Sequence, residues 1–125
     1  MTYVLALDLK RPPMTSNDQR RAHWSAVRAA KSDVETLVGW HVKKNHIPLV
    51  GYCDVEVVWF APDGRKRDAD SLGPFLKAAL DGLKKSGVIA DDSREFVRKT
   101  ASWVEIDRAL PRIEIRIVEL ESGAA

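Results

Sequence analysis

The strictest pattern in this sequence is the alternation of apolar and charged residues near its C-terminal end. Residues 111–120 read PRIEIRIVEL, so that Ile113, Ile115 and Ile117 alternate with charged side chains. Successive side chains of a β-strand point to opposite faces, so the pattern predicts a strand with one buried face. Such a strand needs neighbouring strands and a second layer over its apolar side, which the rest of the chain must supply.

Three further segments carry strand patterns. Residues 3–9 (YVLALDL) place four apolar side chains on one side, and residues 52–60 (YCDVEVVWF) alternate apolar and acidic side chains. A weaker pattern lies near residues 96–105. Pro12 and Pro13 end the first strand because proline has no N–H to donate to a sheet.

Two segments between these strands show helical spacing. From residues 16–18 (SND), which offer helix caps, to about residue 45, apolar positions recur every three or four residues and include Trp24, which we expect in the core. A second helix starts near residue 72 with a Gly-Pro pair in its first turn, and Gly87 follows its end. The order β-α-β-α-β-β predicts an α+β fold with two main helices packed on one mixed sheet.

Composition is that of one ordinary globular domain. The chain has 125 residues, of which 45% are hydrophobic and 30% charged. We expect residues 1–120 to form the domain and residues 121–125 a disordered tail. The apolar runs are too short for a bilayer span, the N-terminus lacks a secretion signal, and a single cysteine cannot form an internal disulfide. We therefore expect a cytoplasmic protein with no membrane partner.

Basic residues gather near the front of the chain, although the net charge is only +2. Between Lys10 and Lys31 there are six Lys or Arg residues and one acid, Asp18. The segment is consistent with a solvated helix face and equally with a surface for a polyanion.

Acids gather further along, where they would repel one another. The stretch RKRDADSL runs three bases into Asp68 and Asp70, and Asp91 and Asp92 follow side by side. Bringing two carboxylates to about 4 Å costs roughly 4 kcal/mol at an effective dielectric constant of about 20. A divalent cation would compensate this cost, since carboxylate oxygens are the ligands that Mg²⁺ and Mn²⁺ prefer. The three bases would then meet the phosphates of a substrate.

Simpler roles are open to the same residues. Asp70 or Ser71 could cap the second helix, which contributes about 1 kcal/mol. The acids at 91–92 could lie in a plain turn. Arg67 could pair with Asp68.

Lys77 lies seven residues after Asp70, about two helical turns, so a helix returns it to roughly the same side. It could contact a scissile phosphate there. It could also be the i, i+4 partner of Asp81.

The block RDADSL followed by LKAALDGLKKSGVIADDS resembles the signature of the RusA family of Holliday-junction resolvases of bacteria and phages. That signature has an Asp-x-Asp-Asn-Leu start, a Lys and an Asp-Ala/Gly-Leu in the following helix, then a Gly and an Asp-Asp pair. The front of the chain has a matching pattern, formed by Pro12, Pro13, Asn17, Arg21, His23 and Trp24.

The resemblance implies a small α/β fold and a homodimeric endonuclease that resolves Holliday junctions by paired nicks in DNA recombination and repair. It implies Mg²⁺ as cofactor, for which Mn²⁺ can substitute. The metal ligands would be Asp68, Asp70 and one or both of Asp91 and Asp92, of which Asp92 fits better. The catalytic residues would be Asp68, Asp70, Lys77 and Asp92.

Eight basic and polar residues are candidates for contact with DNA. They are Asn17, Arg20, Arg21, His23, Lys31, Arg65, Lys66 and Arg67. The chain departs from the family in two places: Ser71 stands where Asn is usual, and residues 73–75 lengthen the segment before Lys77.

Two other functions fit the same residues. A non-catalytic module that binds branched DNA would use the bases for phosphates and the acids only as caps. A metal-dependent phosphohydrolase of small substrates would need neither the basic front segment nor a dimer.

Overall fold

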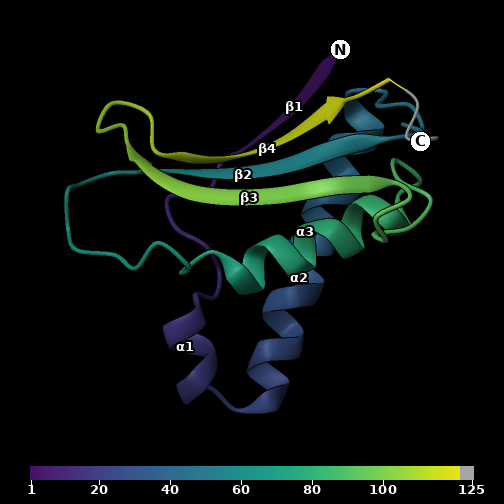
Figure 1. Cartoon of the computed structure of the whole chain (residues 1–125). Coiled ribbons are helices and arrows are strands. Elements are labelled where there is room, and N and C mark those ends of the chain that lie inside the picture. The colour runs from purple at the N-terminus through teal and green to yellow at the C-terminus, as the bar shows by residue number, and fades with distance from the viewer. Residues whose placement is uncertain (122–125) are drawn as a thin grey trace.

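Four strands in one sheet carry two long helices on one face (Figure 1). The computed structural model describes residues 1–121. Its elements are β1 (Thr2–Leu7), α1 (Ser16–Arg21), α2 (Trp24–Lys44), β2 (Cys53–Ala61), α3 (Gly73–Lys85), β3 (Val97–Ile106) and β4 (Arg112–Glu119). The predicted α+β fold and element order are confirmed, and each strand lies within two residues of its predicted bounds. Residues 122–125 of the expected tail lie outside the described residues.

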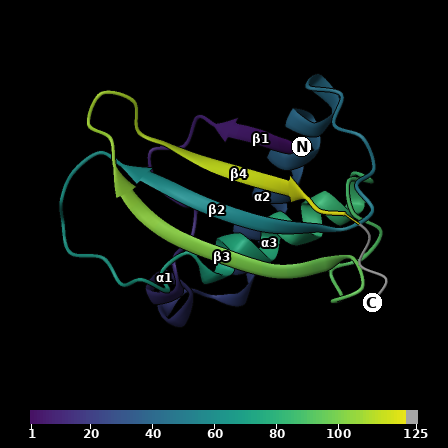
Figure 2. The ribbon, with the colours of Figure 1, turned by 45° about the horizontal axis from the view of Figure 1, so that its top comes forward.

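The sheet has the order β1-β4-β2-β3 (Figure 2). Strand β4 lies antiparallel to both of its neighbours, whereas β2 and β3 run parallel. The strongly alternating strand is therefore central, and Ile113, Ile115 and Ile117 are fully buried. Their side of the sheet faces α2 and α3, whose buried residues include Val38 and Phe75.

The first predicted helix is broken in two, so the prediction of one continuous helix was wrong. Thr15, not residues 16–18, caps α1: its hydroxyl accepts the N–H of Asp18 at 3.2 Å, and the Asp18 carboxylate accepts the N–H of Thr15 at 3.1 Å. Ala22 is extended, and His23 begins α2 by accepting the N–H of Ser25 at Nδ1. A capping side chain can start a new helix without any proline or glycine to mark it.

The expected burial of Trp24 was also wrong. Its side chain is 64% exposed, because the first turns of α2 project away from the sheet, past α3 (Figure 1). Helix α3, in contrast, begins and ends as predicted. Proline lies in its first turn, and Gly87 adopts a left-handed conformation (φ 83°) just after it.

The other face of the sheet is covered by its own side chains. Figure 1 shows no helix on that side. The guanidinium of Arg112 lies 3.9 Å from the centre of the Phe60 ring, and the carboxylate of Glu114 binds Arg112 and Arg116 at 2.8 and 3.0 Å. Val58 is fully buried beneath this layer. Long charged side chains thus shield apolar surface while their charged groups stay paired.

None of the helices within residues 1–121 is long and apolar enough to cross a membrane.

Helices α2 and α3 pack tightly against each other at Gly82. A methyl group there would lie 3.0 Å from the Val38 Cβ and 3.2 Å from the backbone of Glu35. We expect Gly82→Ala to lower the free energy of unfolding by about 1–2 kcal/mol in a urea titration, because overpacking at this contact exceeds the gain in helix propensity. Gly39→Ala is the control, since nothing lies within 4 Å of its added carbon. Equal stability of the two variants would contradict the close contact.

Candidate functional site

The connection between β2 and α3, residues 62–72, carries the predicted bases and the first two acids. Its charges are arranged around Asp63, which is not among the predicted site residues. The Asp63 carboxylate accepts the N–H of Arg65 at 3.1 Å and binds the Arg67 guanidinium at 2.8 Å. These two contacts hold the pKa of Asp63 below its usual value.

Arg67 has a structural position rather than an exposed one. Its side chain is only 16% exposed, and its guanidinium lies 4.7 Å from the centre of the Trp59 ring. It also donates to the carbonyl of Asp63. The predicted alternative, an ion pair between Arg67 and Asp68, does not form.

A cavity of about 540 Å³ opens between this connection and the segment before α1. We call it the basic hollow. Trp59 and Asn17 line it, and the Trp59 indole N–H donates to the carbonyl of Lys10 at 2.9 Å, which ties the two walls together. Five cations line the hollow with two carboxylates, those of Asp63 and Asp68. The cations are Lys10, Arg11, Arg65, Lys66 and Arg67.

Asp68 lines the hollow, and Asp70 lies between it and the start of α3. Both are exposed, and neither carboxylate has a hydrogen-bond or ion-pair partner within residues 1–121. Only the backbone of Asp70 is engaged, because its carbonyl accepts the Ser16 hydroxyl at 2.9 Å. The carboxylates of Asp68 and Asp70 are therefore not paired with any of the three bases that precede them in the sequence.

Capping of α3 by Asp70 or Ser71, the simpler role considered above, is not observed. The N-cap is Leu72, with no side-chain hydrogen bond. The Ser71 side chain is buried, and its hydroxyl has no partner in the part of the chain that the structure describes. Ser71 lines the basic hollow.

The second pair of acids lies against lysines of α3. The Lys77 ammonium is 3.4 Å from Asp92 and 3.5 Å from Asp81, and the Lys84 ammonium is 3.1 Å from Asp91. Lys77 thus makes the i, i+4 contact with Asp81 and also reaches Asp92. Asp81 and Asp92 raise the pKa of Lys77, so this lysine is a cation at neutral pH and not a base.

The four predicted metal ligands do not form one cluster. Residues 1–121 contain no group of three His, Cys, Asp or Glu side chains placed to hold a metal ion. The carboxylates have the chemistry that Mg²⁺ prefers, but their arrangement in a single chain does not fit a site with three protein ligands. Metal binding stays a prediction.

The predicted DNA contacts divide into three groups. Asn17, Arg65 and Lys66 line the hollow, while Arg20, Arg21 and His23 are exposed on and after α1. Lys31 is held by Asp81 at 2.9 Å, and Arg67 is held by Asp63. The site prediction did not include Lys10 and Arg11. Their basic segment was visible in the sequence, but no local pattern places residues 10–11 beside residues 65–67.

No protein-family model matches the sequence, and no curated protein matches it. The resemblance to the RusA family remains an inference from the motifs.

The basic hollow is expected to hold a polyanion. Replacing Arg65 and Lys66 with Ala should make the protein elute from a heparin column at lower salt, because each lost phosphate or sulfate contact reduces the ions released on binding. The Lys43→Ala, Lys44→Ala double variant at the end of α2 changes the net charge by the same amount and is the control. Identical elution of the two variants would show that only net charge matters and that the hollow has no special role.

Proposed function

We propose that this chain is an endonuclease that acts on branched DNA as a homodimer with Mg²⁺, the function implied by its resemblance to the RusA family. One structural observation supports it most. The Asp68 carboxylate, which has no partner within residues 1–121, lines a hollow together with five cations, and the equally unpartnered Asp70 follows it two residues later.

The charge arrangement suits a phosphodiester accompanied by a cation. If Asp68 and Asp70 served to neutralise the neighbouring bases, Arg65 and Arg67 would bind them; instead both guanidinium groups lie by Asp63. Arg11 is paired with Asp18, whereas Lys10 and Lys66 have no carboxylate partner within residues 1–121 and keep positive charge for an anion. Asp68 and Asp70 remain open for a cation. A DNA phosphate with a divalent ion presents both charges side by side.

The chain's own residues have distinct tasks in this proposal. Lys10, Arg65 and Lys66 bind phosphates, which positions the DNA without reading its sequence. Lys77, a permanent cation at neutral pH, lies at the Asp92 carboxylate and would stabilise negative charge that develops on the scissile phosphate. A Mg²⁺ ion held by three of the acids would require them to move closer together than they are in the described chain, whereas one or two carboxylates with a DNA phosphate and waters would suffice for Mg²⁺.

A dimer belongs to the proposal for a geometric reason. A four-way junction has approximate two-fold symmetry, and two copies related by a two-fold axis present two equivalent sites to it. Paired nicks at opposite strands would then separate the junction into two duplexes.

A second function is favoured by a specific observation. Lys77 and Lys84 neutralise the acids at 91–92, and residues 1–121 contain no group of three or more side chains placed to hold a metal ion. A module that binds branched DNA without cutting it needs no such group. The two functions differ in metal-dependent cleavage.

The first test is Asp70→Asn. We expect the purified protein with Mg²⁺ or Mn²⁺ to cut a four-way junction and to spare linear duplex. Asp70→Asn should bind the junction without cutting it. Cleavage is measured on a denaturing gel. Asp33→Asn, which removes an exposed acid of α2, should cut normally. Wild-type activity in Asp70→Asn would reject the site; salt-sensitive binding without cleavage by the wild-type protein would favour the binding module.

The second test concerns Lys77. Lys77→Ala should lower the single-turnover cleavage rate by about 100-fold, the usual effect of removing one group that stabilises transition-state charge, with junction affinity nearly unchanged. Lys85→Ala removes a lysine of the same helix that binds Glu35 at 2.8 Å and should cut at the normal rate. Equal rates for the two variants would exclude Lys77 from the catalytic site.

A further inference from the structure

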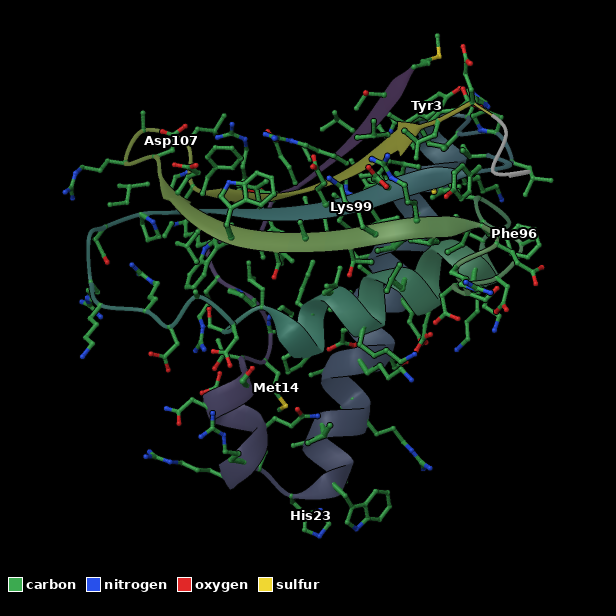
Figure 3. All side chains as sticks on the ribbon, viewed as in Figure 1. Tyr3, Met14, His23, Phe96, Lys99 and Asp107 are labelled. Atoms are coloured by element: carbon green, nitrogen blue, oxygen red, sulfur yellow. The ribbon has the colours of Figure 1, made fainter. Side chains whose placement is uncertain are left out.

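The corner where α1 meets α2 is a second surface with the chemistry of a nucleic-acid contact. The backbone is extended at Ala22 and His23, and the two helices join there at the end of the molecule farthest from the sheet (Figure 3). Trp24 begins α2 at this point and is 64% exposed. The core does not account for this indole, since the buried residues of α2 begin only at Val34.

A guanidinium group and an imidazole ring lie beside the indole. The Arg28 guanidinium lies 5.2 Å from the centre of the Trp24 ring, and the His23 ring lies 5.4 Å away on centroids. Arg20 and Arg21 form the basic last turn of α1, and the first turn of α2 contains no acid. We call this set the aromatic corner: Arg20, Arg21, His23, Trp24 and Arg28.

The aromatic corner is connected to the basic hollow by α1. Asn17, at the start of this six-residue helix, lines the hollow. Arg20 and Arg21, which belong to the aromatic corner, lie in its last turn. Six helical residues span about 9 Å, the distance over which a DNA strand passes two to three nucleotides. A strand whose phosphates lie in the hollow can therefore reach the corner.

The chemistry of this surface selects one ligand. An indole offers a flat face on which any base can stack, and arginines beside it bind the flanking phosphates. In continuous duplex DNA each base face is already covered by its neighbours. Open faces occur where the stack ends, as at a branch point.

We propose that Trp24 stacks on an exposed base at the branch point of DNA, with Arg20, Arg21 and Arg28 on the adjacent phosphates. This inference rests on the proposed function for its substrate. It makes Trp24 the residue that distinguishes branched from continuous DNA, separately from any residue that cuts.

Trp40 provides a control within the same helix. It is 55% exposed, and Lys44 lies 4.8 Å from the centre of its ring. It follows Trp24 by 16 positions, about 24 Å along a helix, and so lies far from the corner. Trp40 thus shares with Trp24 an exposed indole and a nearby cation, and it differs from Trp24 in its position relative to the basic hollow.

The test measures binding without metal, in EDTA, so that cleavage does not enter. Fluorescence anisotropy compares a four-way junction with a linear duplex of the same length. We expect Trp24→Ala to weaken junction binding about tenfold, within the range seen when a stacking aromatic is removed, and to change duplex binding less than twofold. Trp24→Phe should retain most of the affinity, Trp24→Leu should lose it, and Trp40→Ala should match the wild-type protein.

A second measurement reports stacking directly. With 2-aminopurine at the branch point, its emission should change on binding of the wild-type protein and of Trp40→Ala, but not of Trp24→Leu. Circular dichroism melting establishes that each variant is folded. Equal loss of junction and duplex affinity, an unchanged junction affinity in both Trp24→Ala and Trp24→Leu, or no junction binding by the wild-type protein would overturn the inference. So would a Trp24 requirement for binding to vesicles of anionic phospholipid in place of the junction.

The outcomes separate this inference from the nuclease proposal. A protein that binds junctions through Trp24 but does not cut them retains the inference and loses the endonuclease. A protein that cuts junctions, and that binds them equally well when Trp24 is replaced, retains the endonuclease and loses the inference.

Discussion

The close packing of α2 against α3 at Gly82 is the contact on which the functional surfaces depend. It brings the two helices together where a Cβ would lie 3.0 Å from Val38, and it sets them on the buried face of β4. From this crossing α3 presents Lys77 and Lys84 to the acids at 91–92, and its start receives the 62–72 connection. The same crossing leaves the first turns of α2 projecting away from the sheet, where Trp24 is exposed.

The separation of charge around Asp63 explains why bases and acids so close in the sequence do not cancel. Asp63 binds Arg67, and Arg67 packs over Trp59, so the connection is held by a contact that uses neither Asp68 nor Asp70. An ion pair that is partly buried has a fixed geometry and is less screened than one at the surface. Lys66, Asp68 and Asp70 are left without ion-pair partners within residues 1–121, which suits the phosphate and the cation of the proposed function.

The acids at 91–92 show the other way in which repelling carboxylates are made tolerable. Each lies by a lysine of α3, so their charge is balanced without a metal ion. Repulsion between carboxylates can be compensated by an ammonium group as well as by a divalent ion, and the pattern of acids in the sequence does not distinguish the two. Lys77 and Lys84, about two turns apart on α3, supply the positive charge that offsets these carboxylates. This is why a sequence pattern of acids alone was not enough to establish a metal centre.

The sequence by itself determined the elements and their order. Alternation at residues 111–120, the glycine after α3 and the proline at its start are local signals, because strand faces, turns and caps depend on neighbouring residues. Only the tertiary structure decided which charges meet. The pairing of Arg67 with Asp63, the placement of Lys10 and Arg11 beside residues 65–67, and the exposure of Trp24 follow from how distant segments pack, and packing is a property of the whole chain that no local spacing reports.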